Sequence, residues 1–303
     1  MKKAASFALG CKVNQYESEA IAELFAEKGY EIVGIDEEAD VYVINTCTVT
    51  NFGDKKSRQL IRKVKRQNEN AIVAVVGCYA QTAPKELMEI AGVNLVIGTK
   101  DRAQIVEMVE QYDRANGVEN HVSDIMKERV FEPLSIQKLA NRTRAYLKIQ
   151  DGCSQYCSYC IIPYARGPIR SREPQEVVAE VKRLAENGFK EVASYGKDRR
   201  DTSLLDILKQ VHEVEGIERI RFSSIEPNVV TEEFAQTMAA LPKVCDHFHL
   251  SLQSGCDETL ERMNRRYRSG EYRERCELLR EVYGNPALTT DVIVGFPQES
   301  EEE

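Results

Sequence analysis

Short apolar runs alternate with amphipathic segments along most of the chain, and this alternation limits the possible folds more than any other feature of the sequence. In the first third, the patterns predict strands over residues 4–9, 41–45, 71–76 and 94–97, and helices over residues 17–29, 54–67 and 102–112. The run at 71–76, AIVAVV, is apolar throughout, as is typical of a strand covered on both faces. Strands that alternate with helices predict an α/β fold with a parallel, doubly wound sheet.

A second alternating series follows a polar break. Residues 116–138 are mostly polar and contain a proline, so we expect a linker between an N-terminal domain over 1–115 and a second domain over 139–303. In the second domain the patterns predict strands over 145–150, 191–194, 219–223, 247–252 and 289–294, and helices over 174–187, 203–214, 232–240 and 271–282. Five strand–helix steps indicate a (βα) barrel or part of one. Because the sequence ends in an acidic run where the next helix is due, we expect an incomplete barrel.

The composition excludes an integral membrane protein, because no apolar run approaches the roughly 20 residues that a membrane-spanning helix needs. The net charge is -8, so any contact with nucleic acid must use local basic patches. One candidate is the predicted helix over 54–67, which is either a solvated face or a surface that contacts phosphates. Its basic residues are Lys55, Lys56, Arg58, Arg62, Lys63, Lys65 and Arg66. A second candidate is the group of Arg166, Arg170 and Arg172.

The nine cysteines, an odd number, fit a set of disulfides poorly and indicate a reducing, cytoplasmic environment in which cysteines bind metals or catalyse. Three of them, Cys153, Cys157 and Cys160, follow the first predicted strand of the second domain with the spacing Cys-x3-Cys-x2-Cys. Three thiolates this close together bind either an iron–sulfur cluster or zinc. Because no fourth Cys or His lies nearby in sequence, the spacing favours a 4Fe–4S cluster with one iron open to a ligand.

Three further cysteines recur at equivalent places in the first domain. Cys11, Cys47 and Cys78 each come just after a different predicted strand. The loops after parallel strands share the carboxyl edge of the sheet, where doubly wound folds bind their ligands, so these residues are candidates for a second shared centre. The alternative is that each is a small buried hydrophobic residue, as single cysteines often are. The remaining residues, Cys245, Cys256 and Cys276, show no such pattern.

Several motifs resemble one protein family over nearly the whole chain. A Cys-x3-Cys-x2-Cys motif after the first barrel strand is the hallmark of radical S-adenosylmethionine (SAM) enzymes. The N-terminal motifs LGCKVNQYES, INTCTVTNFGDKKSRQ and GCYAQ, and the later motifs CSYCIIPYARGPIRSRE, LSLQSG and DVIVGFPQE, resemble the radical SAM methylthiotransferases. LGCKVN and CTVTNFGDKKSRQ are similar to the branch that modifies N6-threonylcarbamoyladenosine beside the tRNA anticodon. The isopentenyladenosine branch usually has a CQMN-like first motif, and the ribosomal-protein branch a CPKN-like one.

The resemblance implies two 4Fe–4S clusters and SAM as cofactors. The cluster in the barrel would bind SAM and cleave it to a 5′-deoxyadenosyl radical, and the N-terminal cluster would carry or donate methylsulfide to C2 of the adenine. The implied metal ligands are Cys153, Cys157 and Cys160 for the first cluster, and Cys11, Cys47 and Cys78 for the second; the implied SAM-binding residues are Ser251, Gln253, Ser254 and Gly295. No side chain is implied as a proton-transfer catalyst. The implied partners are the anticodon stem-loop of tRNA and an electron donor such as a flavodoxin.

The chain departs from the family in two places. The segment EVASYGKDRRDTSLL, residues 191–205, is shorter than its family counterpart after the second barrel strand. The family's sixth barrel strand and its C-terminal TRAM domain, an RNA-binding β-barrel, are expected to be absent. Two alternatives to the main hypothesis therefore stay open. One is the same chemistry on isopentenyladenosine in tRNA or on a ribosomal protein, and the other is an inactive remnant that binds a cluster or RNA.

Overall fold

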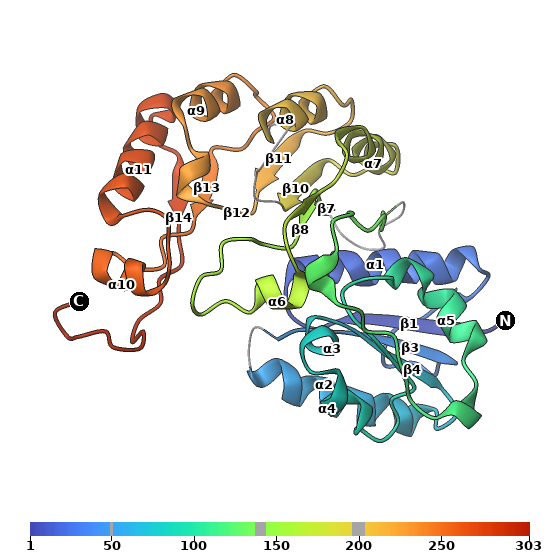
Figure 1. Cartoon of the computed structure of the whole chain (residues 1–303). Helices are drawn as coiled ribbons and strands as arrows, with labels where there is room; N and C mark the ends of the chain where they lie inside the picture. Colours follow the sequence, from blue (N-terminus) through green and yellow to red (C-terminus); the bar gives the residue numbers. More distant parts are fainter. Residues whose placement is uncertain (49–50, 137–143, 196–203) are drawn as a thin grey trace. The chain divides into compact units, whose positions relative to one another are not determined.

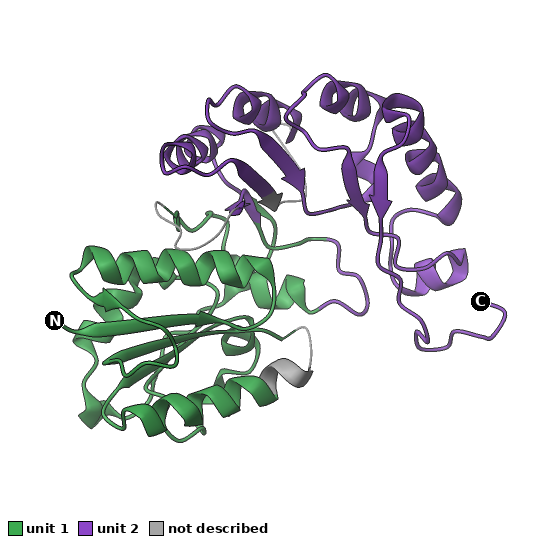
Figure 2. Ribbon diagram, turned by 180° about the vertical axis from the view of Figure 1, so that it is seen from behind, with its two compact units in different colours: residues 1–139, 151–154, 161–170 green, residues 140–150, 155–160, 171–303 purple. Residues whose placement is uncertain are grey.

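The computed structural model describes residues 1–48, 51–136, 144–195 and 204–303 (Figure 1). It divides into two compact units (Figure 2). Unit 1 consists of residues 1–139, 151–154 and 161–170, and unit 2 of residues 140–150, 155–160 and 171–303. The chain therefore returns to unit 1 twice after residue 139. No helix in the described part of the chain is both long and apolar enough to cross a lipid bilayer.

Unit 1 is built on one parallel sheet with the order β2-β1-β3-β4-β5-β6. The strands are β1 (Lys3–Ala8), β2 (Glu31–Ile32), β3 (Val41–Thr46), β4 (Ile72–Gly77), β5 (Leu95–Ile97) and β6 (Glu119–Asn120). The doubly wound parallel sheet expected from the sequence is confirmed. The edge strands β2 and β6 have two residues each, which is too short to leave a periodic pattern. Residues 119–120, inside the segment for which a linker was expected, pair with β5; the predicted domain boundaries stay a prediction.

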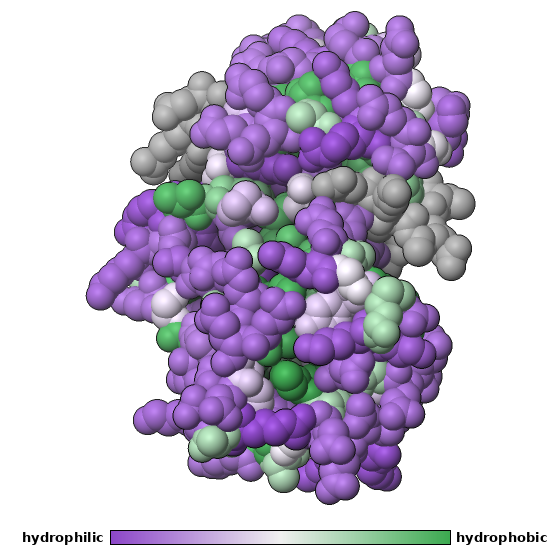
Figure 3. Space-filling view, turned by 90° about the vertical axis from the view of Figure 1, so that its right-hand side faces the viewer, coloured by the Kyte–Doolittle hydropathy of each residue, from purple (hydrophilic) through white to green (hydrophobic). Residues whose placement is uncertain are grey.

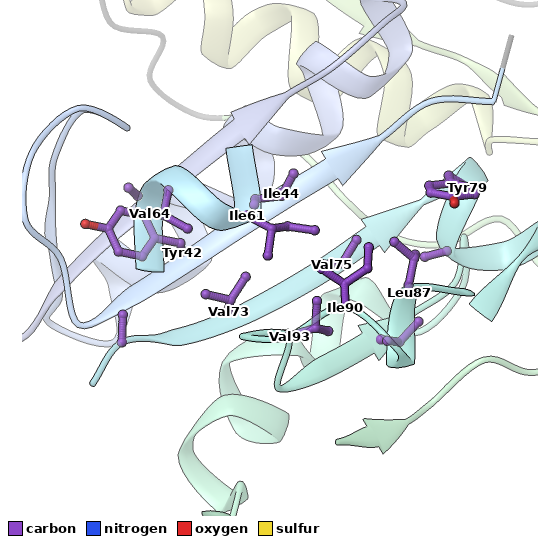
Figure 4. Close-up of a cluster of buried hydrophobic side chains, with 14 of the residues drawn as sticks. Tyr42, Ile44, Ile61, Val64, Val73, Val75, Tyr79, Leu87, Ile90 and Val93 are labelled. Atoms are coloured by element: carbon purple, nitrogen blue, oxygen red, sulfur yellow. The ribbon is translucent and has the colours of Figure 1, made fainter. Parts of the chain in front are cut away.

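Helices cover both faces of this sheet, because the central strands have apolar side chains on both faces. They are α1 (Lys12–Glu27), α2 (Asn51–Gln67), α3 (Cys78–Thr82), α4 (Pro84–Met88) and α5 (Ile105–Gln111). Tyr42 and Ile44 of β3 pack with Ile61 and Val64 of α2 in one buried cluster (Figure 4). Val43, the residue between them, belongs to the cluster on the other face, with residues of α1 and α5. The two cores fix the position of the sheet edge that carries the first candidate site.

Unit 2 repeats parallel strands and helices in chain order. Two three-stranded sheets have the orders β11-β10-β7 and β12-β13-β14. Their strands are β7 (Arg144–Lys148), β10 (Glu191–Tyr195), β11 (Arg219–Phe222), β12 (Ser224–Ile225), β13 (His247–Leu250) and β14 (Ala287–Thr289). The helices are α7 (Pro174–Glu186), α8 (Leu204–His212), α9 (Glu232–Ala239), α10 (Asp257–Arg262) and α11 (Ser269–Tyr283). Only Ser223 separates β11 from β12, so one extended segment passes from the first sheet to the second.

The last predicted strand, over 289–294, is wrong. The strand in that region is β14, which ends at Thr289, and beyond it Val292 makes one isolated bridge to Gln253. Val292 and Val294 have the β-branched side chains typical of a strand, but both are exposed. The shortened segment after the second barrel strand falls largely on residues 196–203, which lie outside the described residues.

On the face drawn in Figure 3, hydrophilic residues predominate.

Candidate functional site

Three cysteines lie at the carboxyl edge of the unit 1 sheet. Cys11 follows β1, Cys47 follows β3 and Cys78 follows β4. The strand order 2-1-3-4-5 is that of the flavodoxin-like folds, in which chain direction across the sheet reverses between β1 and β3. Such folds bind ligands in the crevice outside the carboxyl ends of the strands at that reversal. Two of the three cysteines, Cys11 and Cys47, therefore lie at this reversal, and Cys78 lies one strand away.

Gly10 brings the backbone of the first cysteine loop against Cys47. Its φ of +101° suits glycine, and a Cβ built on it would lie 2.4 Å from the Cys47 Cβ and 2.5 Å from its Sγ. Cys78 is buried, and burial raises the pKa of its thiol to about 11, with Arg166 opposing this shift and Glu17, Cys11 and Cys47 adding to it. The described residues contain no group of three or more His, Cys, Asp or Glu side chains already arranged to hold a metal ion.

Gly10→Ala is expected to displace Cys47 and to reduce the iron held by the N-terminal cysteines, because the added methyl group occupies the space of that side chain. Gly29→Ala is the matched control. Gly29 also has a positive φ, +84°, but nothing lies within 4 Å of an added Cβ, so this variant has the backbone strain without the clash. Iron analysis after anaerobic reconstitution compares the two. Equal iron contents in both variants would show that the close approach does not matter.

A buried ionic network lies beside these cysteines within unit 1. Arg166 donates from Nη1 to Glu17 Oε1 at 2.8 Å and to Asp151 Oδ1 at 3.0 Å. Its Nη2 donates to Asn14 Oδ1 at 2.8 Å, and the same oxygen lies 3.5 Å from Cys11 Sγ. Arg166 is thus linked to Cys11 through one amide side chain. Burial acts to lower the pKa of Arg166, but Cys78, Glu17 and Asp151 raise it well above its usual value, so the cation is permanent.

A second arginine completes the network. Arg102 Nη1 lies 2.7 Å from Glu17 Oε2, and its Nη2 lies 2.6 Å from Glu132 Oε2. Glu17 and Arg102 are fully buried. Of these residues only Arg166 was selected from the sequence, and it was selected as an RNA contact rather than as part of this network. The only sequence signal was the position of Asn14 and Glu17 within the motif LGCKVNQYES, which pattern analysis alone treats as a solvated helix start.

The remaining cysteine motif spans both units. Cys153 belongs to the segment of unit 1 over 151–154, and its N–H donates to the Gly167 carbonyl at 3.1 Å. Cys157 and Cys160 belong to unit 2, where the Cys160 N–H donates to the Cys157 carbonyl at 2.9 Å. All three are partly exposed. That the three thiols share one centre stays a prediction of their spacing.

Three of the four SAM-binding candidates lie together after β13. Ser251 and Ser254 are buried, and Gln253 has a φ of +68°. The loop is tied to the segment before Gly295, since the Gln253 N–H donates to the Asp291 carbonyl at 3.0 Å and the Ile293 N–H donates to the Gln253 carbonyl at 2.8 Å. Gly295 has a φ of +71°, and nothing lies within 4 Å of an added Cβ. The structure thus joins the two predicted SAM-binding segments through their backbones, while contact with SAM stays a prediction.

The two predicted basic patches differ in the structure. On α2, several cations have local partners. Lys63 pairs with Asp36, Arg58 lies 3.3 Å from Glu86, and Lys65 donates to the carbonyls of Glu69 and Ala71. Lys55, Arg62 and Arg66 are exposed.

The second patch is wrong as an RNA-contacting surface. Arg166, Arg170 and Arg172 are all at least 95% buried, and Arg166 and Arg172 pair with the buried carboxylates of Glu17 and Glu180.

Comparison with known proteins adds independent information. Residues 3–98 match the uncharacterized protein family UPF0004, and residues 147–303 match the radical SAM superfamily. The chain is 47% identical over its full length to the threonylcarbamoyladenosine tRNA methylthiotransferase MtaB of Bacillus subtilis, of which it covers 69%. It is 41% identical to the corresponding protein of Aquifex aeolicus, with 75% of that protein covered. It is 35% identical to the tRNA-2-methylthio-N(6)-dimethylallyladenosine synthase of Dictyoglomus thermophilum, with 69% covered.

Solved structures are similar in fold. The cobalamin-dependent SAM radical enzyme OxsB superposes with a TM-score of 0.63 at 12% identity, covering 97% of this chain and 49% of that one. The radical SAM methyltransferase TsrM from Kitasatospora setae superposes with a TM-score of 0.62 at 17% identity, covering 96% and 67%. At these identities the likeness concerns the fold alone. It agrees with a parallel α/β unit that precedes a strand–helix repeat.

Proposed function

Because the chain belongs to the radical SAM methylthiotransferase family, in its threonylcarbamoyladenosine tRNA methylthiotransferase branch, we propose that it adds a methylthio group to C2 of N6-threonylcarbamoyladenosine beside the tRNA anticodon. The identity supports this branch: it is 47% to the B. subtilis relative and 35% to the dimethylallyladenosine synthase. The observation that carries the proposal is the placement of Cys11, Cys47 and Cys78 after three parallel strands of one sheet edge.

The residues at this edge fit an iron–sulfur cluster. Gly10 leaves space beside Cys47 that any other residue would fill. Burial raises the pKa of the Cys78 thiol, and the buried cation of Arg166 partly offsets this effect in favour of the thiolate that a metal requires. We assign Cys11, Cys47 and Cys78 to one 4Fe–4S cluster, and Cys153, Cys157 and Cys160 to another. When bound, these clusters and SAM supply the radical chemistry and the methylthio group.

The chain's own residues position the groups that would hold these cofactors. Asn14 fixes the loop after β1, because its amide donates to the carbonyls of Leu9 and Thr46, each at 2.9 Å. These bonds tie the loop that contains Cys11 to the end of β3, next to Cys47. In unit 2 we propose that Ser251, Gln253, Ser254 and Gly295 receive SAM, since their two segments are bonded to each other through backbone groups.

The partners follow from the proposed reaction. The relatives' names specify tRNA, so we propose the anticodon stem-loop of tRNA as substrate and place the reaction in the cytoplasm. The exposed residues Lys55, Arg62 and Arg66 on α2 supply cations for phosphate contacts. An electron donor such as a flavodoxin is also part of the proposal, because SAM cleavage needs one electron.

Mass spectrometry of tRNA nucleosides tests the proposal. We expect a strain that lacks the gene to lose 2-methylthio-N6-threonylcarbamoyladenosine and to accumulate the unmethylthiolated nucleoside. Reintroducing the gene should restore the product. Loss of a methylthiolated isopentenyladenosine instead, or no change in any nucleoside, would contradict the proposed substrate.

Single Cys11→Ala, Cys47→Ala and Cys78→Ala variants are each expected to abolish methylthiolation while SAM cleavage continues, because they lack one ligand of the N-terminal cluster only. Cys245→Ala is the matched control, since Cys245 lies in neither cysteine set and should retain the product. SAM cleavage is measured as 5′-deoxyadenosine and methylthiolation as modified nucleoside in one reaction. Full methylthiolation by any one of the three variants would disprove the shared site.

A further inference from the structure

The guanidinium group of Arg265 lies against one of the cysteines of unit 2. Arg265 stands in the loop between α10 and α11, and its Nη1 is 3.3 Å from Cys157 Sγ. Its side chain is only 4% exposed, although the neighbouring Arg266 is exposed. Arg265 and Cys157 are 108 residues apart in sequence. The contact is therefore a product of the fold of unit 2.

Other groups of unit 2 hold this guanidinium in a fixed orientation. Nη2 donates to Glu226 Oε2 at 2.6 Å and lies 3.3 Å from the Ser251 carbonyl oxygen, and Nε donates to the Tyr267 hydroxyl at 3.1 Å. The Tyr267 hydroxyl in turn donates to the carbonyl of Leu252 at 2.5 Å. Arg265 thus connects the loop of Cys157 with the end of β13, where Ser251 lies.

The contact between Arg265 and Cys157 is not needed to neutralise the buried guanidinium. Arginine does not lose its proton in proteins, so a buried guanidinium needs a counter-charge, and Glu226 supplies it. A pair with Glu226 alone would satisfy that need. The additional N–H directed at Cys157 Sγ is a charge-assisted hydrogen bond whenever the sulfur is a thiolate, as in any metal centre.

We propose that Arg265 is a positioning residue that sets the electron affinity of the iron–sulfur centre ligated by Cys157. This inference rests on the proposed function, since it takes Cys157 as a cluster ligand. Hydrogen bonds to the sulfurs and the net charge nearby are among the factors that fix the reduction potential of such clusters. A fixed cation beside the sulfur stabilises the reduced state, which carries one more negative charge, and so raises the potential. Glu226 opposes this effect from the other side of the guanidinium.

The two substitutions Arg265→Gln and Glu226→Gln are therefore expected to shift the potential in opposite directions. Arg265→Gln removes the cation, and we expect the equilibrium between oxidised and reduced centre to move about tenfold toward the oxidised form, which is about 59 mV for a one-electron couple. Glu226→Gln leaves the cation without its counter-charge and should raise the potential. Arg266→Gln is the matched control: it removes the same charge from the next residue, which is exposed, and should leave the potential unchanged.

The experiment uses the full chain with Cys11, Cys47 and Cys78 replaced by alanine, so that a single centre titrates. Iron is quantified after anaerobic reconstitution, and the potential is measured by redox titration followed by electron paramagnetic resonance. An Arg265→Gln variant with full iron and an unchanged potential overturns the inference. Absence of iron from the background chain itself contradicts the proposed function, which distinguishes the two failures.

A second variant keeps the inference testable if Arg265→Gln fails to fold. Arg265→Lys retains the cation but not the planar fork that contacts Cys157 and Glu226 together. We expect Arg265→Lys to retain iron and to have a reduction potential between those of the parent chain and Arg265→Gln. If Arg265→Gln does not fold, the expected result is a potential below that of the parent chain. A potential equal to the parent's, together with no rise in Glu226→Gln, overturns the inference.

Discussion

Glu17→Gln is expected to lower the free energy of unfolding of unit 1 by about 3–5 kcal/mol, because it leaves two buried arginines short of a counter-charge. Glu17 is fully buried, and its carboxylate oxygens lie 2.8 Å from Arg166 and 2.7 Å from Arg102. Removing one partner of a buried ion pair lowers the free energy of unfolding far more than removing one partner of an exposed pair, since the remaining buried charge stays desolvated. The expected effect is among the largest that a single substitution in unit 1 can have.

Hydrogen exchange of the core strands β3 and β4 measures this effect, because it reports the opening of unit 1 separately from unit 2. Glu86→Gln is the matched control. Glu86 pairs with Arg58 at 3.3 Å on the surface, with 58% of its side chain exposed, so its neutralisation should change exchange little. Equal exchange rates in the two variants would mean that the buried network does not stabilise unit 1.

Replacing Cys153, Cys157 and Cys160 together by alanine is expected to abolish SAM cleavage and to leave about half of the iron, because the N-terminal cluster has its own ligands. Iron, sulfide and 5′-deoxyadenosine are measured after anaerobic reconstitution. A chain with Cys245→Ala and Cys256→Ala, which lie outside both cysteine sets, controls for the loss of thiols. Circular dichroism shows whether the variants are folded.

Two results would contradict this assignment. Retention of all the iron would mean that the three residues are not ligands. Loss of all the iron from a folded chain would mean that the two centres depend on each other, contrary to the proposal of two separate sets of ligands.

The longer strands of unit 1 and their parallel arrangement were predictable from the sequence. The predicted strand over 41–45 differs from the observed β3 (Val41–Thr46) by only one residue. The prediction was close because four of the six residues of this buried strand are apolar. Predicting a parallel sheet from alternating strands and helices then placed the cysteines at one edge. The short edge strands β2 and β6 depend on pairing with neighbours, which local pattern does not contain.

The polar half of the candidate site was not predictable in this way. The helix was predicted to begin at residue 17, but it begins at Lys12. The prediction missed this start because the first turns contain the polar residues Asn14 and Glu17, which hydropathy assigns to solvent. Both are buried, and their partner Arg166 lies 152 and 149 residues further along the chain. The sequence likewise suggested Arg166 as an RNA contact. A buried charge and an exposed one look alike in sequence until the tertiary partner is known.

The segmented composition of unit 1 has a consequence for how the protein is made. Its buried network needs Asp151 and Arg166, which the ribosome adds after residues 1–139 have been synthesised. Until then Glu17 has Arg102 but lacks Arg166, the second of its two buried cations. The N-terminal unit therefore cannot complete its packing until the chain has been synthesised past residue 166, which includes the cysteine loop at 153–160. A cleavage site placed after residue 139 would likewise yield an N-terminal piece that lacks part of its own interior.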